Sequence, residues 1–146
     1  MLDLQNALPV PAFGTLMHIP VVSTIGAARR FEDLPIDEWA DVPTPKHARK
    51  TDRYCSAIIV GDSLVEKGIQ DGDVAVIRLT FDASEMHQGQ LLAVWTPYGL
   101  LLKFVYRTLK NKVRLVSANS EYEDLFLDAD DVSVQGVVEY TMHYWR

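Results

Sequence analysis

The chain has 146 residues, 48% of them hydrophobic and 23% charged, a composition that fits one globular domain with its own core. Its single cysteine, Cys55, excludes an internal disulfide and a cysteine-based zinc site, and its net charge of −6 argues against binding nucleic acid by charge alone. No apolar run approaches the roughly 18 residues of a membrane span, and the N-terminus lacks a signal-peptide pattern, so we expect a cytoplasmic protein that binds no membrane.

The first third of the chain predicts an arm and a loop. Residues 1–20 are rich in proline, and residues 1–18 are expected to form an arm or linker. Residues 21–28 are small and apolar, which suits an extended segment lying in a groove, because small side chains let two backbones approach closely. Three prolines punctuate residues 31–53 and argue against helix there. We therefore predict a loop, with Trp39 and Val42 pinning it to the body.

From residue 56 onward, short apolar runs alternate with turn signals. The runs are Ser56–Val60, Val74–Leu79, Gln90–Trp95, Leu100–Leu109, Lys112–Ser117 and Val132–Tyr144. Their valine, leucine, isoleucine and aromatic residues are typical of strands, and turns at this spacing predict a mostly antiparallel β domain. Between the first two runs, Ser63–Ile69 has room for a helical turn, which we predict to be short or 3₁₀.

Ser63 stands in the first sequence block that suggests chemistry, Gly61-Asp62-Ser63-Leu64. These letters match the first block of the GDSL lipases and esterases, but that family needs an aspartate three residues before a histidine. None of the four histidines has one, so we reject that interpretation. The histidines are also scattered without ligand spacing, and no Gly-rich phosphate loop is present, so neither a metal site nor a cofactor is expected.

Lys103 is the second candidate, because it lies inside an apolar run that predicts a strand. One interpretation is an edge-strand lysine that reaches water or discourages aggregation. The other is a buried lysine that loses its proton. Because pH 7 is about 3.4 units below the pKa of an ordinary lysine, neutralising one costs roughly 4.6 kcal/mol. Burial shifts lysine pKa values by up to about 3–5 units, and a neutral lysine beside a serine hydroxyl forms a nucleophile–base dyad.

With these two residues, the sequence resembles the self-cleaving domain shared by LexA, lambdoid phage repressors and UmuD. The serine block and the lysine that follows it by 40 residues carry the resemblance, which covers residues 19–146. The matching blocks are Val60–Leu64, Gly68-Ile69, Asp71–Asp73, Gly89–Ala93, Asn119–Tyr122 and Val134–Val138. The resemblance implies a LexA-like, signal-peptidase-like β fold with an N-terminal cleavage-site arm.

The family carries its own substrate upstream of the serine, and the resemblance assigns it here. Ile19-Pro20 begins a segment that fits the family register and ends at Ala27-Ala28, which would be the scissile bond. This sequence departs from the family at Ala28, where the family has glycine. The added methyl group is expected to hinder close approach, and one hypothesis is that Ala28 is a substitution that keeps the chain whole.

The resemblance also implies roles and partners. Ser63 would attack the carbonyl of Ala27, Lys103 would act as the general base, and the backbone N–H groups of Asp62 and Ser63 would form the oxyanion hole. An activated RecA filament would favour the docked arm after DNA damage, and the domain would form a homodimer. DNA would be bound by a separate N-terminal domain, so no nucleic acid contacts are expected here.

Three hypotheses remain open from the sequence. The first is the self-cleaving C-terminal domain of a LexA-like or phage repressor. The second is a UmuD-like subunit of a translesion polymerase, which the length of the arm suits. The third is a dimerisation module that does not cleave, for which Ala28 is the main support.

Overall fold

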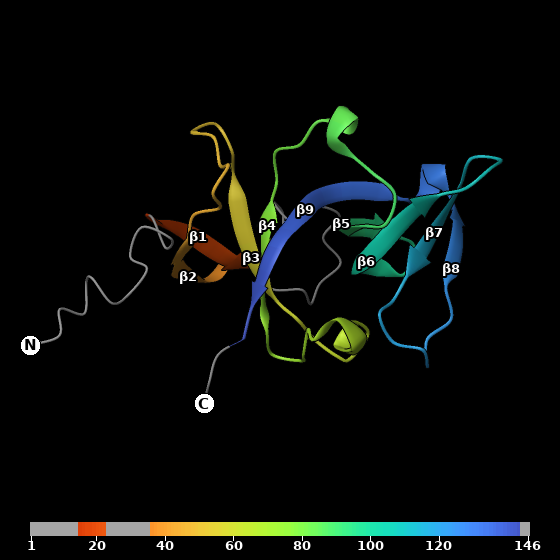
Figure 1. Cartoon of the computed structure of the whole chain (residues 1–146), viewed down its shortest axis with the longest axis horizontal. Helices are drawn as coiled ribbons and strands as arrows, with labels where there is room; N and C mark the ends of the chain where they lie inside the picture. The colour runs from red at the N-terminus through yellow and green to blue at the C-terminus, as the bar shows by residue number, and fades with distance from the viewer. Residues whose placement is uncertain (1–14, 23–35, 144–146) are drawn as a thin grey trace, which may run out of the picture.

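The computed structural model describes residues 15–22 and 36–143, and within them the regular secondary structure consists of strands and short 3₁₀ helices (Figure 1). In chain order the elements are β1 (Leu16–Val22), β2 (Ile36–Pro43), β3 (Tyr54–Ile58), the 3₁₀ helix η2 (Val65–Lys67), β4 (Val74–Arg78), η3 (Ala83–Glu85), β5 (Gln90–Thr96), β6 (Gly99–Arg107), β7 (Lys112–Val116), β8 (Leu125–Asp128), η4 (Ala129–Asp131) and β9 (Ser133–Met142). No helix in these ranges is long and apolar enough to cross a membrane.

The strands form one sheet in the order β2-β1-β3-β4-β9-β5-β6-β7-β8. Neighbouring strands are antiparallel except β1 and β3, which run parallel where Val21 pairs with Ser56. The predicted mostly β fold is thus confirmed, with one parallel pair added to the antiparallel sheet. The short helical turn predicted within Ser63–Ile69 is present as η2.

The long strand β9 joins the two halves of the sheet and arches across the middle of the molecule (Figure 1). Its C-terminal part pairs with β4 and its N-terminal part with β5, and the pairing slips by one position in each half, which allows the bend. Gly136 lies where β9 passes closest to β4: a Cβ there would lie 2.5 Å from Ile77 Cγ2 and 2.8 Å from the Arg78 carbonyl oxygen.

Three buried clusters form the core of the described residues. The largest cluster includes Leu64, Ile77 and Ala93. The second contains Val94 and Leu115 among others. Because Leu64 directly follows Ser63, the largest cluster fixes the position of the serine turn.

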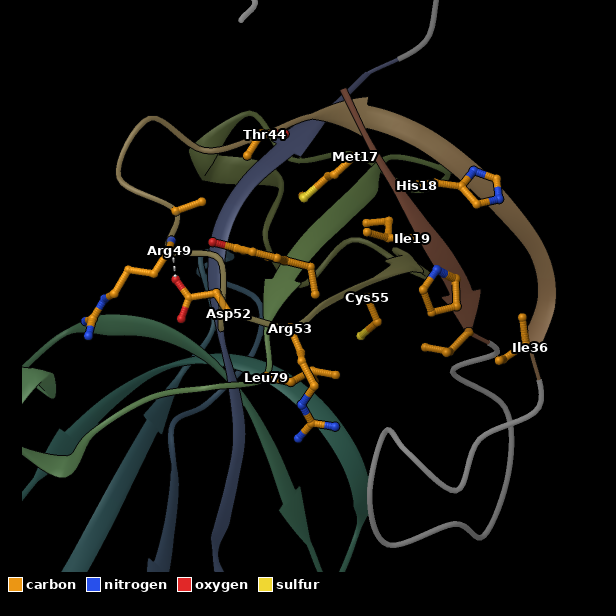
Figure 2. Close-up of a pocket in the computed structure, with 14 residues that line it drawn as sticks. Met17, His18, Ile19, Ile36, Thr44, Arg49, Asp52, Arg53, Cys55 and Leu79 are labelled. Atoms are coloured by element: carbon orange, nitrogen blue, oxygen red, sulfur yellow. Dashed lines mark hydrogen bonds between the residues drawn. The ribbon is translucent and has the colours of Figure 1, made fainter. Parts of the chain in front are cut away.

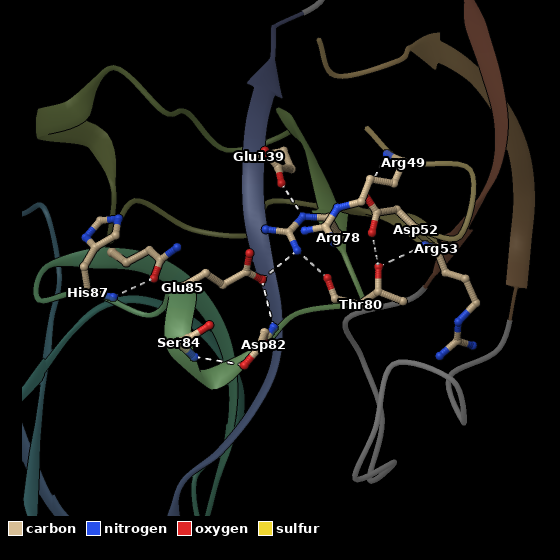
Figure 3. A network of polar contacts seen from close by, with 11 residues as sticks. Arg49, Asp52, Arg53, Arg78, Thr80, Asp82, Ser84, Glu85, His87 and Glu139 are labelled. Atoms are coloured by element: carbon tan, nitrogen blue, oxygen red, sulfur yellow. Dashed lines mark hydrogen bonds and ion pairs between the residues drawn. The ribbon is translucent and has the colours of Figure 1, made fainter. Parts of the chain in front are cut away.

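A polar network around Arg78 ties β4 to its neighbours (Figure 3). The guanidinium donates to Glu85 Oε1 at 2.8 Å and to Glu139 Oε1 at 2.6 Å, which connects β4 with η3 and β9. Asp82 and Glu85 close η3 with a reciprocal capping box. Arg78 thus pairs with both Glu85 and Glu139 and holds these three elements together.

Three strands lie outside the runs predicted to be strands: β1 overlaps the end of the predicted arm, β2 lies within the loop predicted at residues 31–53, and β8 lies between two predicted runs. Strands β2 and β8 are at the edges of the sheet, where proline and charged residues are tolerated, so their composition hid them. Val42 is fully buried as predicted, whereas the prediction for Trp39 is wrong: it is 54% exposed and stacks on His18 at 5.2 Å between ring centroids.

Candidate active site

Ser63 lies on a short turn between β3 and η2, and hydrogen bonds to the Asp71–Asp73 turn shape the start of that turn. Gly61 has a positive φ of 92°, a conformation that glycine adopts without strain. Its N–H donates to Asp71 Oδ1 at 2.7 Å. Buried Ile59 precedes the turn and buried Leu64 ends it, so the half-buried Ser63 is held between two anchors.

The segment after β7 holds the other side of the serine turn. The Ala118 N–H donates to the Ser63 carbonyl oxygen at 2.7 Å, and the Glu66 N–H donates to the Ala118 carbonyl oxygen at 2.7 Å. The Asn119 side-chain amide donates to the carbonyl oxygen of Asp62 at 2.9 Å. These bonds make the turn part of the folded framework rather than a free loop.

Tyr122 contacts the serine turn through its hydroxyl group. Its hydroxyl donates to Asp62 Oδ1 at 2.6 Å, and this bond to the carboxylate raises the pKa of the tyrosine. The face of its ring lies 5.9 Å from Lys103 Nζ, within range of a cation–π contact. One side chain therefore contacts the residue before the serine and also flanks the lysine.

Lys103 lies in the middle of β6, with its side chain half-buried. Desolvation by burial lowers the pKa of its amine. The Nζ donates to Ser117 Oγ at 2.7 Å. Of the two interpretations of this residue, the structure favours the one in which burial helps the lysine to lose its proton.

Ser63 and Lys103, 40 residues apart in sequence, line the same cavity of about 260 Å³. The other lining residues are apolar and come from the end of β3, the serine turn and the start of β6: Ile58, Ile59, Val60, Leu64, Leu100, Leu101 and Leu102. An apolar wall of this kind offers the amine few polar groups in place of water, which disfavours the ammonium form of the lysine. The arrangement is suited to a serine nucleophile with a lysine base.

The scissile residues predicted from the sequence, Ala27 and Ala28, lie outside the described residues. Sequence reasoning did not identify Ser117 or assign a role to Tyr122. Tyr122 had a signal, since it ends the Asn119–Tyr122 block. Ser117 had none, because a serine after a strand is typical of any turn.

A larger cavity of about 500 Å³ lies elsewhere, between the β1–β2 pair and β3 (Figure 2). Cys55 contributes to its wall, but burial raises the pKa of this thiol to about 12, so it is a poor nucleophile. His18 pairs with Asp41 at 2.7 Å on the exposed side of the strands. Among the described residues, no group of three or more His, Cys, Asp or Glu side chains has the geometry to hold a metal ion.

Comparison with known proteins shows the family of the chain. The chain matches the Peptidase S24-like family over residues 20–139. It is 33% identical over 123 residues to the LexA repressor of Pelagibacter ubique, an alignment that covers 84% of this chain and 52% of that protein. The LexA repressor of Novosphingobium aromaticivorans is 32% identical over 132 residues, covering 90% of this chain and 53% of the relative.

A third relative, the LexA repressor of Staphylococcus aureus, is 31% identical over 129 residues, which cover 84% of this chain and 57% of that protein. The chain thus spans about half the length of the curated relatives it matches. The family match includes the serine turn, β6 and the segment after β7. Because it extends over most of the sequence, the chain belongs to the Peptidase S24-like family and is a LexA-like domain.

Proposed function

We propose that this chain is the self-cleaving C-terminal domain of a LexA-like or phage repressor and that it cuts its own Ala27–Ala28 bond. The observation that carries the proposal is the shared cavity: Ser63 and a half-buried lysine with a lowered pKa line one apolar-walled pocket. The LexA repressors among its relatives support the repressor context.

In the proposed first step, neutral Lys103 takes the proton of the Ser63 hydroxyl while Oγ attacks the carbonyl carbon of Ala27. Negative charge develops on the carbonyl oxygen. Among the described residues, no hydrogen bond uses the backbone N–H of Asp62 or Ser63, which leaves both donors for that oxygen. The Lys103 ammonium then gives its proton to the Ala28 nitrogen as the C–N bond breaks. Water finally hydrolyses the ester between Ala27 and Ser63.

Tethering makes this reaction intramolecular. Ala27 is five residues beyond Val22, the end of β1, which is roughly 17 Å of extended chain. Val22 in turn pairs with Ala57 of β3, the strand that leads into the serine turn. A tethered substrate has a high effective concentration, so the position of the arm controls the rate.

Regulation and assembly follow the repressor assignment. We infer that an activated RecA filament favours the docked arm, acting through its differential affinity for that state. The domain is proposed to act as a homodimer in the cytoplasm, with DNA bound by another part of the repressor. Ala28 favours one second candidate, a dimerisation module that does not cleave, because a β-carbon beside the attacked carbonyl crowds the approach.

The test is intact-mass analysis after incubation at mildly alkaline pH, with and without RecA filament. The expected products are fragments 1–27 and 28–146, formed faster in Ala28→Gly and absent in Ser63→Ala and Lys103→Ala. Lys112→Ala, which removes an exposed lysine of β7 that pairs with Asp128, is the matched control and should cleave normally. An intact chain in every version would leave the dimerisation module and refute self-cleavage.

A further inference from the structure

The hydrogen bond from Lys103 Nζ to Ser117 Oγ, 2.7 Å long, is built into the register of the sheet. Strands β6 and β7 are antiparallel, and their register pairs Phe104 with Val116. Continuing this register by one position, back along β6 and forward past the end of β7, would bring Lys103 opposite Ser117. Directly opposite residues project from the same face of a sheet, so the backbone itself brings the amine to the hydroxyl.

The residue after Ser117 fixes the nucleophile. Ala118 bonds to the backbone on both sides of Leu64, donating to the Ser63 carbonyl oxygen and accepting from the Glu66 N–H, each at 2.7 Å. Consecutive residues thus contact the lysine and the serine turn. A shift of this segment would therefore displace the Lys103 amine and the Ser63 turn in the same direction.

We propose that Ser117 is a positioning residue that orients the Lys103 amine toward Ser63. The inference rests on the function proposed above. A neutral amine has two N–H bonds and one lone pair. When Ser117 Oγ accepts one N–H, rotation about the terminal bond of the lysine is restricted, and the lone pair is free to take the Ser63 proton. The same acceptor then holds one N–H of the ammonium ion.

Without this acceptor, the four-carbon lysine stem regains rotamers that aim the amine elsewhere. The other groups that face the amine do not replace it. The Tyr122 ring attracts a cation over its face at 5.9 Å but fixes no N–H direction, and the Tyr122 hydroxyl is engaged by Asp62. The remaining walls of the cavity are mostly leucine, isoleucine and valine side chains.

The experiment compares first-order self-cleavage of Ser117→Ala, Ser117→Thr and the native sequence across pH 7 to 11, all in the Ala28→Gly background. Misplacing a catalytic group by about 1 Å costs up to roughly 100-fold, so we expect Ser117→Ala to cleave about 10- to 100-fold more slowly at its plateau. Ser117→Thr keeps a hydroxyl and should stay within about threefold of native. Ser120→Ala, an exposed serine nearby, is the matched control.

The pH profile separates positioning from a merely structural role. A hydrogen bond to the charged form favours that form, so its loss in Ser117→Ala should move the half-maximal pH downward while the plateau falls. Thermal melting is measured for every variant. Ser117→Ala cleaving at the native rate or faster would overturn the inference, and so would equal slowing in Ser117→Thr together with lowered melting temperatures.

The two proposals fail in different ways. Cleavage that persists in Ser63→Ala, or is absent from every version, overturns the dyad and the positioning role with it. Cleavage that requires Ser63 and Lys103 but ignores Ser117 overturns the positioning role alone.

Discussion

A charge placed at Val60 should tune the base from across the cavity. Val60 lines the same cavity as Ser63 and Lys103, and it is 69% exposed, so polar substitutions there cost little stability. In Val60→Asp, a carboxylate favours the ammonium form and raises the pKa of Lys103. In Val60→Lys, a second ammonium disfavours that form and lowers the pKa further.

The size of the effect follows from the exposure of the site. Exposed charge pairs are worth about 0.2–1 kcal/mol, which corresponds to roughly 0.1–0.7 pH units. Below the pKa of the lysine, the neutral fraction changes about tenfold per pH unit. Val60→Asp should therefore cleave up to about fivefold more slowly than the neutral control Val60→Asn, and Val60→Lys up to about fivefold faster.

The assay is the first-order rate of fragment formation against pH in the Ala28→Gly background. The midpoint of that profile reports the pKa of the base separately from any effect on docking of the arm. In about 1 M salt the two midpoints should converge, because screening shortens the reach of an exposed charge to roughly 3 Å. Midpoints that move in the same direction for both charged variants, or do not move, would refute the reasoning.

Three further predictions concern the lysine, the tyrosine and the strand crossing. Burial lowers the pKa of Lys103 from 10.5, so just below pH 10.5 the unfolded chain binds more protons than the native chain, and the free energy of unfolding should rise with pH there. In urea unfolding, Lys103→Met should remove that rise. The same dependence of unfolding free energy on pH in both chains would contradict the prediction. Tyr122→Phe, which loses the bond to Asp62, should slow cleavage severalfold without lowering the melting temperature, and native-rate cleavage would show that the bond is dispensable. Gly136→Ala forces a methyl group against the Arg78 backbone and should lower the free energy of unfolding by about 1–3 kcal/mol in urea titration, a prediction that a neutral result would disprove.

The sequence predicted a strand correctly where the composition of the segment itself favours a strand. Each apolar run predicted to be a strand forms one, because its β-branched and leucine side chains are buried when the run pairs within the sheet. Strands β2 and β8 were missed because they are edge strands, whose structure depends on the neighbouring strand more than on their own composition. Trp39 was misplaced for the same reason: pairing of β2 with β1 directs it outward onto His18.

The candidate site shows the same division. Ser63 and Lys103 were found because a glycine-flanked serine block and a lysine inside an apolar strand are unusual in themselves. The contact of Ser117 with Lys103 depends on the register between β6 and β7, which no local pattern encodes. The structure thus adds the residues that contact Lys103 and the serine turn.

The central claim is that the Lys103 amine is the base, and chemical rescue tests it most directly. Lys103→Cys replaces the amine with a thiol, and alkylation with 2-bromoethylamine then restores an amine on a thioether stem. Buried Cys55, whose thiol pKa is raised to about 12, should resist alkylation, and mass analysis checks that one group has been added. The measurement is the pH–rate profile of self-cleavage before and after alkylation. The account predicts no cleavage before, and afterwards cleavage whose midpoint lies below that of the native chain, because sulfur lowers the pKa of the amine. Rapid cleavage by the unalkylated chain, or a restored rate with an unshifted midpoint, would contradict it.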